Sequence, residues 1–408
     1  MSGRVNVKFV VILSAVLLLV MGGAVFAAAM VLMKSGADHA ALAVKAEDAG
    51  DWKSAERSWG NAVNEEQTNP EYLEGYLNAI QNKPNETATD YQVQFEKYRS
   101  VLRTIAEVRR SDLAAHEHYF DELVLMLRSS PPTRSSYEFL ISEVDRVESL
   151  LYNESPEIMQ NLRRYRGEAV AVISQVAADV NEDLLDKGIE DLKASREVRP
   201  GDIGITEALY TLYTKKAERA KTSRRDDEAA QAYASAHEAV SEFAQSNPDN
   251  IAGQFLLLRA DIDQALLGLE SKQFFGPELS RARQNTLAAF ADRTDELALR
   301  AQSADPAQLT GRTMNVITGV IASVNPEGAP EALENIWDQA SKNPAQDRGQ
   351  QFAHGQFLRQ IGKHPEAIAI FEEIADLPDV PVTTEGYLRY QDRNRALYFM
   401  TDAAIERW

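Results

Sequence analysis

Asn-Pro pairs divide this sequence into segments that have the composition of helices. The pairs are Asn69-Pro70, Asn247-Pro248, Asn325-Pro326 and Asn343-Pro344, and Arg199-Pro200-Gly201-Asp202 is similar to them. Proline disfavours helix in the residue before it but suits the first turn of a helix, so each pair should end one helix and begin the next. The intervening segments are rich in Ala, Leu, Glu and Arg, without the sustained period-two alternation of strands. The sequence therefore predicts an all-α chain.

Length and charge restrict the class of protein further. A chain of 408 residues exceeds what one hydrophobic core usually holds, so several domains or an elongated array are expected. The net charge of -19 would repel phosphate backbones, and we expect no nucleic-acid partner. The basic stretches at Arg163, Arg164 and Arg166 and at Lys215 to Arg225 are interpreted as solvated helix faces. Because the chain has no cysteine, it has no disulfide, thiolate metal site or thiol nucleophile.

A run of uncharged residues near the start of the chain predicts a membrane anchor. It extends from Phe9 to Met33 and, as a helix, would be about 37 Å long, enough to span a hydrocarbon core of about 30 Å. Arg4 and Lys8 precede the run and Lys34 follows it, which favours a cytoplasmic N-terminus and an extracytoplasmic remainder. In a bacterium, the remainder would face the periplasm from the inner membrane.

A cleaved signal peptide is the alternative for the same segment. The basic residues form an n-region, and Val25, Ala27 and Ala29 offer small residues for cleavage. The apolar run continues to Met33 instead of stopping there, which favours a retained anchor. A protein that begins near Ala28 would instead be secreted and soluble.

Glycine, alanine and an aromatic residue recur at the same spacing near both ends of the region after the anchor. The two sets are Gly50, Ala55, Trp59 and Gly362, Ala367, Phe371. Ala332 and Ile336 repeat the small and large pair, and Ala332 lies thirty-five residues before Ala367, within one residue of the period of a known helix-turn-helix repeat. This recurrence resembles the tetratricopeptide repeat (TPR) family.

The resemblance implies an α-helical solenoid of stacked hairpins. In such an array, small residues let two helices approach closely and a large residue one turn later fills the groove against the next pair. The residues expected to pack in this way are Gly50, Trp52, Ala55, Trp59, Ala62, Ala332, Ile336, Gly355, Gly362, Ala367 and Phe371. Tetratricopeptide arrays hold a protein or peptide partner in a groove. The positions that match groove positions are Val44, Glu47, Phe352, Gln356, Arg359 and Gln360.

The predicted organisation follows from the anchor and the repeats. The expected parts are a cytoplasmic N-terminus at 1–8, a transmembrane helix at 9–33, a first TPR-like hairpin at 34–69, a degenerate helical region at 70–180, TPR-like repeats at 181–382 and a capping helix at 383–408. Region 70–180 is either worn repeats or a separate helical domain. Its helices are expected near Tyr72–Asn82, Thr89–Arg110, Leu113–Arg128, Ser136–Tyr152 and Glu157–Ala178.

No motif in the sequence predicts an active site. His116 and His118 are two residues apart and point to different sides of a helix, whereas helical metal sites need a spacing of four. Phosphate-binding loops, dinucleotide fingerprints and nucleophile elbows are absent from the sequence. We therefore expect no enzyme activity, cofactor or metal, and a membrane-anchored scaffold or adaptor that binds proteins. The alternatives are the secreted form and a ligand-binding or enzymatic helical protein with a pocket in region 70–180.

Overall fold

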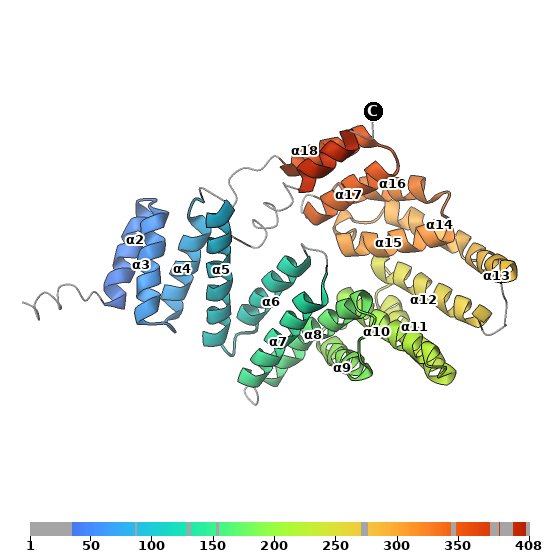
Figure 1. Ribbon diagram of the computed structural model, residues 1–408, viewed down its shortest axis with the longest axis horizontal. Helices are drawn as coiled ribbons and strands as arrows, with labels where there is room; N and C mark the ends of the chain where they lie inside the picture. The colour runs from blue at the N-terminus through green and yellow to red at the C-terminus, as the bar shows by residue number, and fades with distance from the viewer. Residues whose placement is uncertain are drawn as a thin grey trace, which may run out of the picture. The chain divides into compact units, whose positions relative to one another are not determined.

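The computed structural model describes residues 35–85, 88–128, 132–151, 155–270, 276–343, 348–375, 383 and 395–404. These residues form helices joined by turns, and no strand occurs among them (Figure 1). The all-α prediction is confirmed for this part of the chain. The predicted membrane segment at 9–33 lies outside the described residues, and none of the described helices combines the length and apolarity that a bilayer span needs.

The chain divides into two compact units, here called unit 1 and unit 2. Unit 1 comprises Met1–Arg109 with Pro381–Thr383, and unit 2 comprises Arg110–Val380 with Thr384–Trp408. The division falls inside the predicted region 70–180.

Unit 1 is built from consecutive helices, each packed on the next. Its helices are α2 (Gly36–Asp48), α3 (Trp52–Glu65), α4 (Pro70–Asn82) and α5 (Ala88–Val108). Ala43, Ala55 and Ala62 are fully buried between α2 and α3, and Trp59 is 4% exposed. The turn between the two helices needs Gly50, whose φ of 70° is favourable for glycine and strained for other residues.

Unit 2 contains the remaining described helices. They are α6 (Leu113–Arg128), α7 (Arg134–Leu151), α8 (Pro156–Val176), α9 (Glu182–Val198), α10 (Ile203–Thr222), α11 (Asp226–Ser246), α12 (Ile251–Glu270), α13 (Pro277–Ala288), α14 (Ala291–Gln302), the 3₁₀-helix η1 (Pro306–Gln308), α15 (Gly311–Val324), α16 (Ala329–Ala340), α17 (Arg348–Gln360) and α18 (His364–Ala375). Helices α8, α10, α12, α15 and α17 each contact the next of that series, while α9 packs on α8, α11 on α10, and α18 on α17. This serial stacking of hairpins is the arrangement of a solenoid.

Close approach of a glycine backbone to a large side chain recurs in both units. A Cβ atom on Gly75 would lie 2.4 Å from the Trp59 ring, and a Cβ on Gly355 would lie 2.7 Å from the Phe371 ring. The same relation joins Gly167 to Leu192, at 2.4 Å. Each glycine thus provides the space into which a large side chain of an adjacent helix packs.

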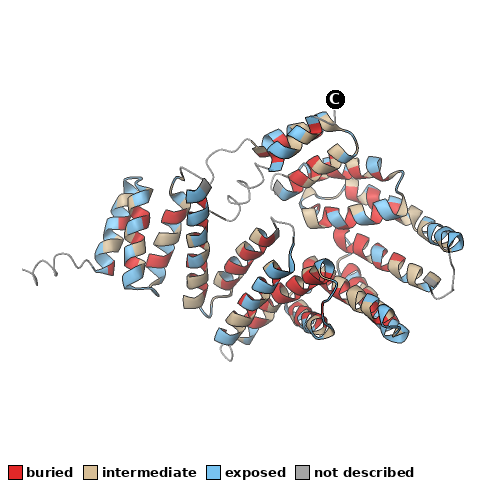
Figure 2. Ribbon diagram, in the orientation of Figure 1, coloured by how far each residue is buried: buried red, intermediate tan, exposed pale blue. Residues whose placement is uncertain are grey.

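Most of the other predicted packing residues are buried among hydrophobic side chains or lie at a turn. Ala367 and Phe371 are fully buried in one hydrophobic cluster, and Ile336 is fully buried in another, against which Ala332 packs half-buried. Gly362 forms the turn between α17 and α18 with a φ of 80°. Buried residues follow one side of most of the described helices, whereas α13 has none (Figure 2).

The Asn-Pro pairs lie at helix boundaries, but their two residues act differently from place to place. Asn69 caps α4 by accepting hydrogen bonds from the backbone N–H groups of Glu71 and Tyr72, and Pro70 is the first residue of that helix. Asn247 and Asn325 end α11 and α15, and the next helices begin only at Ile251 and Ala329. The expectation that each proline begins a helix is therefore correct at Pro70 and wrong at the other described pairs.

Part of the predicted capping helix at 383–408 can be described. Residues 395–404 are helical, and Ala396 and Ala403 are fully buried. Phe399 packs edge-on against Phe352, with ring centroids 5.3 Å apart, and stacks on Phe371 at 6.0 Å. This segment therefore covers an aromatic cluster that α17 and α18 would otherwise expose.

Candidate functional site

The candidate site is a groove in unit 2 along helix α10, here called the α10 groove. Three cavities of about 310, 290 and 240 Å³ adjoin one another there. Gln175 of α8 and Thr211 of α10 line both the second and the third. Thr214 of α10 and Arg259 of α12 line both the first and the third. The shared residues join the three hollows into one surface that crosses α8, α10 and α12.

Helical periodicity explains why α10 supplies so much of this surface. Thr214 and Lys215 are three and four residues after Thr211, and Glu218 is four and three residues after them, so the four residues lie on one side of the helix. Leu209 and Leu212 are almost fully buried and hold the helix in the core. Thr214 donates a hydrogen bond of 2.9 Å to the backbone carbonyl of Tyr210, so its hydroxyl is satisfied within its own helix.

Tyr210 of α10 lines the groove and contacts residues of α12. It is 3% exposed, and its hydroxyl donates to Asp263 of α12. The guanidinium of Arg259 lies 5.4 Å from the centre of the Tyr210 ring. Burial, followed by the charge of Asp263, raises the pKa of Tyr210 above its ordinary value. The phenol therefore stays protonated and acts as a hydrogen-bond donor that ties α10 to α12.

One end of the α10 groove is largely apolar. Val124, Tyr137, Leu140, Val172 and Ala208 line the cavity there. Arg312 of α15 also lines this end. Its Nε lies 3.0 Å from a carboxylate oxygen of Glu207, and another guanidinium nitrogen lies 3.6 Å from Glu168. These contacts join α15 to α8 and α10 beside the apolar surface.

The other end is aromatic and cationic. Tyr233, Lys221, Arg259 and Arg283 line the cavity there, with leucines of α12 and α13. Glu218 and Asp263 are the acidic residues of the same lining, and Lys215 lies 3.6 Å from Glu218. The groove thus offers apolar contacts at one end, hydroxyl and amide groups in the middle, and cations with aromatic rings at the other end.

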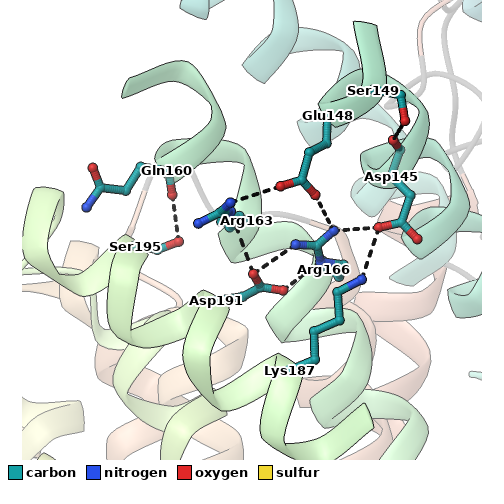
Figure 3. Close-up of polar contacts among 9 residues, drawn as sticks. All are labelled: Asp145, Glu148, Ser149, Gln160, Arg163, Arg166, Lys187, Asp191 and Ser195. Carbon is teal, nitrogen blue, oxygen red and sulfur yellow. Dashed lines mark hydrogen bonds and ion pairs between the residues drawn. The ribbon is translucent and has the colours of Figure 1, made fainter. Parts of the chain in front are cut away.

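A second polar cluster in unit 2 holds helices together (Figure 3). Arg166 of α8 is 3% exposed and donates to both carboxylate oxygens of Asp191 on α9, at 2.6 and 2.9 Å. It also donates to Asp145 and Glu148 of α7, at 2.5 and 2.6 Å. Burial alone would raise the pKa of Glu148, but hydrogen bonds from Arg163 and Arg166 outweigh burial and lower it. The carboxylate therefore stays ionised.

The prediction of a solvated face at Arg163, Arg164 and Arg166 is consequently wrong for Arg166. The Arg164 side chain is 15% exposed and lies 4.3 Å above the Tyr165 ring, so it is also largely covered. Arg163 is the most exposed of the three, at 39%. The acids that pair with these cations come from other helices: Asp145, Glu148 and Asp191 of α7 and α9 for Arg166, and Asp121 of α6 for Arg164.

The predicted groove residues of the first hairpin belong to unit 1. Val44 is 46% exposed. Glu47 accepts hydrogen bonds from the Trp59 indole N–H, at 3.0 Å, and from the Asn78 amide, at 3.3 Å. Glu47 therefore takes part in packing α2 against α3 and α4.

The predicted groove residues near the end of the chain all lie on α17 in unit 2. Phe352 is 8% exposed and belongs to the aromatic cluster with Phe371 and Phe399, which makes it a packing residue. Arg359 lies 5.3 Å from the Phe399 ring centre. Gln356 is half-buried and Gln360 is exposed. The structure brings these four residues together on one helix, away from the lining of the α10 groove.

The α10 groove was not predicted from the sequence. Its polar, charged and apolar residues come from helices between α6 and α15, and they converge only because the hairpins stack. The one signal available was the mixed charge of Lys215 to Arg225, which was interpreted as an ordinary solvated face. Thr211, Thr214 and Lys215 in fact lie half-buried in the groove.

Comparisons with known proteins give only fold-level similarities. No protein-family model matches the chain, and no curated protein matches its sequence. Human IFIT1, solved as a dimer with m7Gppp-AAAA, is 15% identical over 79% of this chain and 67% of that chain, with a TM-score of 0.30. Yeast Tom70 is 15% identical over 93% of this chain and 90% of that chain, with a TM-score of 0.19. The TPR domain of P58(IPK) is 12% identical over 90% and 99%, with a TM-score of 0.20. At these values we transfer no activity or ligand of those proteins to this chain.

Proposed function

We propose that this protein is a non-enzymatic scaffold or adaptor that holds a segment of a protein partner in the α10 groove. The observation that carries the proposal is the continuity of three cavities over α8, α10 and α12. A continuous groove with apolar, hydroxyl-bearing and cationic sections suits an extended peptide, because successive side chains of the peptide would meet different chemistry.

Part of the lining comes from region 70–180, where a separate ligand pocket was the alternative. Val124, Tyr137, Leu140 and Glu168 line the apolar end. This cavity shares Gln175 and Thr211 with its neighbour, so it favours one extended site over an enclosed pocket.

The binding proposal predicts that blocking the middle of the groove lowers its affinity for a bound peptide. Peptides selected from a displayed random library against the full-length purified chain should bind Thr214→Arg at least tenfold more weakly, which corresponds to about 1.4 kcal/mol. The arginine would fill the groove, whereas the native Thr214 hydroxyl bonds only to backbone carbonyls of its own helix. Fluorescence anisotropy with a selected, labelled peptide measures the effect.

Gln231→Arg is the matched control for this substitution. Gln231 is exposed on α11 and does not line the α10 groove. The Gln231→Arg variant should bind the selected peptide with an affinity within twofold of the native value, and its melting temperature should be unchanged. The proposal fails if no peptide is enriched, or if both variants reduce binding equally.

We further propose that residues 9–33 are a retained membrane anchor with the N-terminus in the cytoplasm and the helices from α2 onward outside the cytoplasm. The length of the uncharged run and the position of Arg4 and Lys8 support this arrangement. In a bacterium the units would lie in the periplasm.

The anchor proposal predicts the N-terminus of the mature protein. Mass spectrometry of protein extracted from membranes should find a chain that still contains residues 9–33. The chain should also stay with the membrane during alkaline extraction. A mature chain that starts near Ala28 and is recovered in the soluble fraction would contradict the anchor and favour the secreted form.

A further inference from the structure

Unit 1 has a cavity of its own, of about 560 Å³, which is lined by residues of α3, the end of α4 and α5. The cations among the described residues of its lining are Lys53, Arg57, Lys83 and Lys97, and Glu56 is the one acid there. This local excess of positive charge occurs in a chain whose net charge is -19. The local charge of this cavity is therefore opposite in sign to the net charge of the chain.

Glu56 neutralises only part of this charge. It is 7% exposed and pairs with Lys83 at 2.7 Å and with Lys97 at 2.5 Å. Burial alone would raise the pKa of Glu56, but the two lysines outweigh burial and lower it, so the carboxylate is ionised. One buried anion thus holds two cations at the back of the cavity and leaves a net positive charge.

The remaining cations stand along the exposed side of α3. Lys53 and Arg57 are exposed, and neither forms an ion pair within the described part of the chain. Both act electrostatically on Asp51, whose pKa is lowered first by hydrogen bonds from Ser54 and only then by the charges of Arg57 and Lys53. These two cations are therefore available to an external anion.

Two amide side chains continue the line that the cations begin. Lys53, Arg57, Asn61 and Asn64 are spaced by four, four and three residues, so they follow one side of α3 over about 16 Å. Asn61 and Asn64 form no side-chain hydrogen bond within the described residues. A primary amide both donates and accepts, which matches the N–H and C=O groups of a peptide backbone.

We propose that this cavity binds an acidic stretch of a partner polypeptide, with Lys53 and Arg57 pairing its carboxylates and Asn61 and Asn64 bonding its backbone. The site is on α3 in unit 1 and is independent of the α10 groove. A line of groups about 16 Å long is far larger than one phosphate ion and suits several consecutive residues of a peptide.

The position of the cations disfavours a lipid headgroup as the occupant. A Cβ on Gly36, the first residue of α2, would lie 3.6 Å from the carbonyl oxygen of Ala62 near the end of α3. The start of α2, which follows the proposed anchor directly, is therefore beside the end of α3 that carries Asn64. Lys53 is at the opposite end of that helix, so under the proposed anchor Lys53 would lie at the end of α3 farther from residues 9–33.

The test uses the full-length chain in detergent and a fluorescein-labelled hexaglutamate peptide at low ionic strength. The double variant Lys53→Glu/Arg57→Glu should weaken binding at least tenfold, because each substitution replaces an attraction with a repulsion. Lys45→Glu/Arg99→Glu changes the net charge of unit 1 by the same amount outside the cavity, and should weaken binding less than twofold. Added salt should weaken binding of the native chain, because Lys53 and Arg57 are exposed.

Several results would overturn the proposal. The first is an absence of hexaglutamate binding to the native chain, and the second is an equal loss of binding in the two double variants. The third is that inorganic phosphate, phosphatidylglycerol vesicles or oligoadenylate displaces the peptide with an affinity for the native chain equal to or higher than that of hexaglutamate. Circular dichroism melting verifies that all variants are folded. Thr214→Arg should bind hexaglutamate normally, which separates failure of this proposal from failure of the α10 groove.

Discussion

Replacing Arg166 with methionine is expected to lower the free energy of unfolding of unit 2 by about 3–5 kcal/mol. The guanidinium is 3% exposed and joins α8 to Asp191 of α9 and to Asp145 and Glu148 of α7. Its loss leaves the Asp191 carboxylate, which is 6% exposed, without its main partner in a poorly hydrated place. Urea unfolding followed by circular dichroism measures the change.

Arg163→Met is the matched control, because Arg163 is on the same helix and also pairs with Glu148, at 2.9 Å. Its side chain is 39% exposed, so we expect a loss of about 0–1 kcal/mol. Adding Asp191→Leu to Arg166→Met should recover much of the lost stability, since the unpaired charge is removed. Equal losses in the two single variants would show that Arg166 is not a buried tie between helices.

Phe371→Ala is expected to destabilise the last hairpin by about 3–5 kcal/mol, the usual result of truncating a fully buried phenylalanine. Phe371 is 0% exposed, with its ring centroid 5.5 Å from that of Phe352 and its edge against Gly355. In an array, contacts are mainly between neighbours, so the loss should concentrate near the substitution. Relative to the native chain, the rate of hydrogen exchange should therefore increase more in α17 and α18 than in α8 and α9.

Leu299→Ala serves as the control for this change. Leu299 is 65% exposed on α14, and its truncation should alter stability by no more than about 0.5 kcal/mol. Uniformly faster exchange throughout unit 2 in Phe371→Ala would contradict the view that stability is local to each hairpin.

The helices and the way they pack could be predicted because they depend on local patterns. The ranges expected between Tyr72 and Ala178 correspond to α4 through α8, with ends that differ by a few residues. The spacing of Gly50, Ala55 and Trp59 predicted packing positions, and in the structure Ala55 and Trp59 are buried while Gly50 forms a turn with positive φ. Such features follow from the helical period and from glycine conformation.

The α10 groove and the burial of Arg166 could not be predicted because they depend on which helices stack together. Thr211, Gln175 and Arg259 become neighbours only through contacts of α10 with α8 and α12. The acids that surround Arg166 come from both flanking helices, α7 and α9. The sequence of each helix shows where its charged residues are, but it does not show which residues of other helices they pair with.

Photo-crosslinking in living cells tests the central claim, that the α10 groove holds a partner polypeptide, most directly. The full-length chain would carry a photoreactive phenylalanine analogue at Thr214, and in a separate variant at Gln231. The account predicts a discrete protein adduct from position 214 and none from position 231. When the crosslinking is repeated on isolated membranes with an excess of a selected groove-binding peptide, the adduct from position 214 should disappear. No adduct from position 214, or the same adducts from both positions, would contradict it.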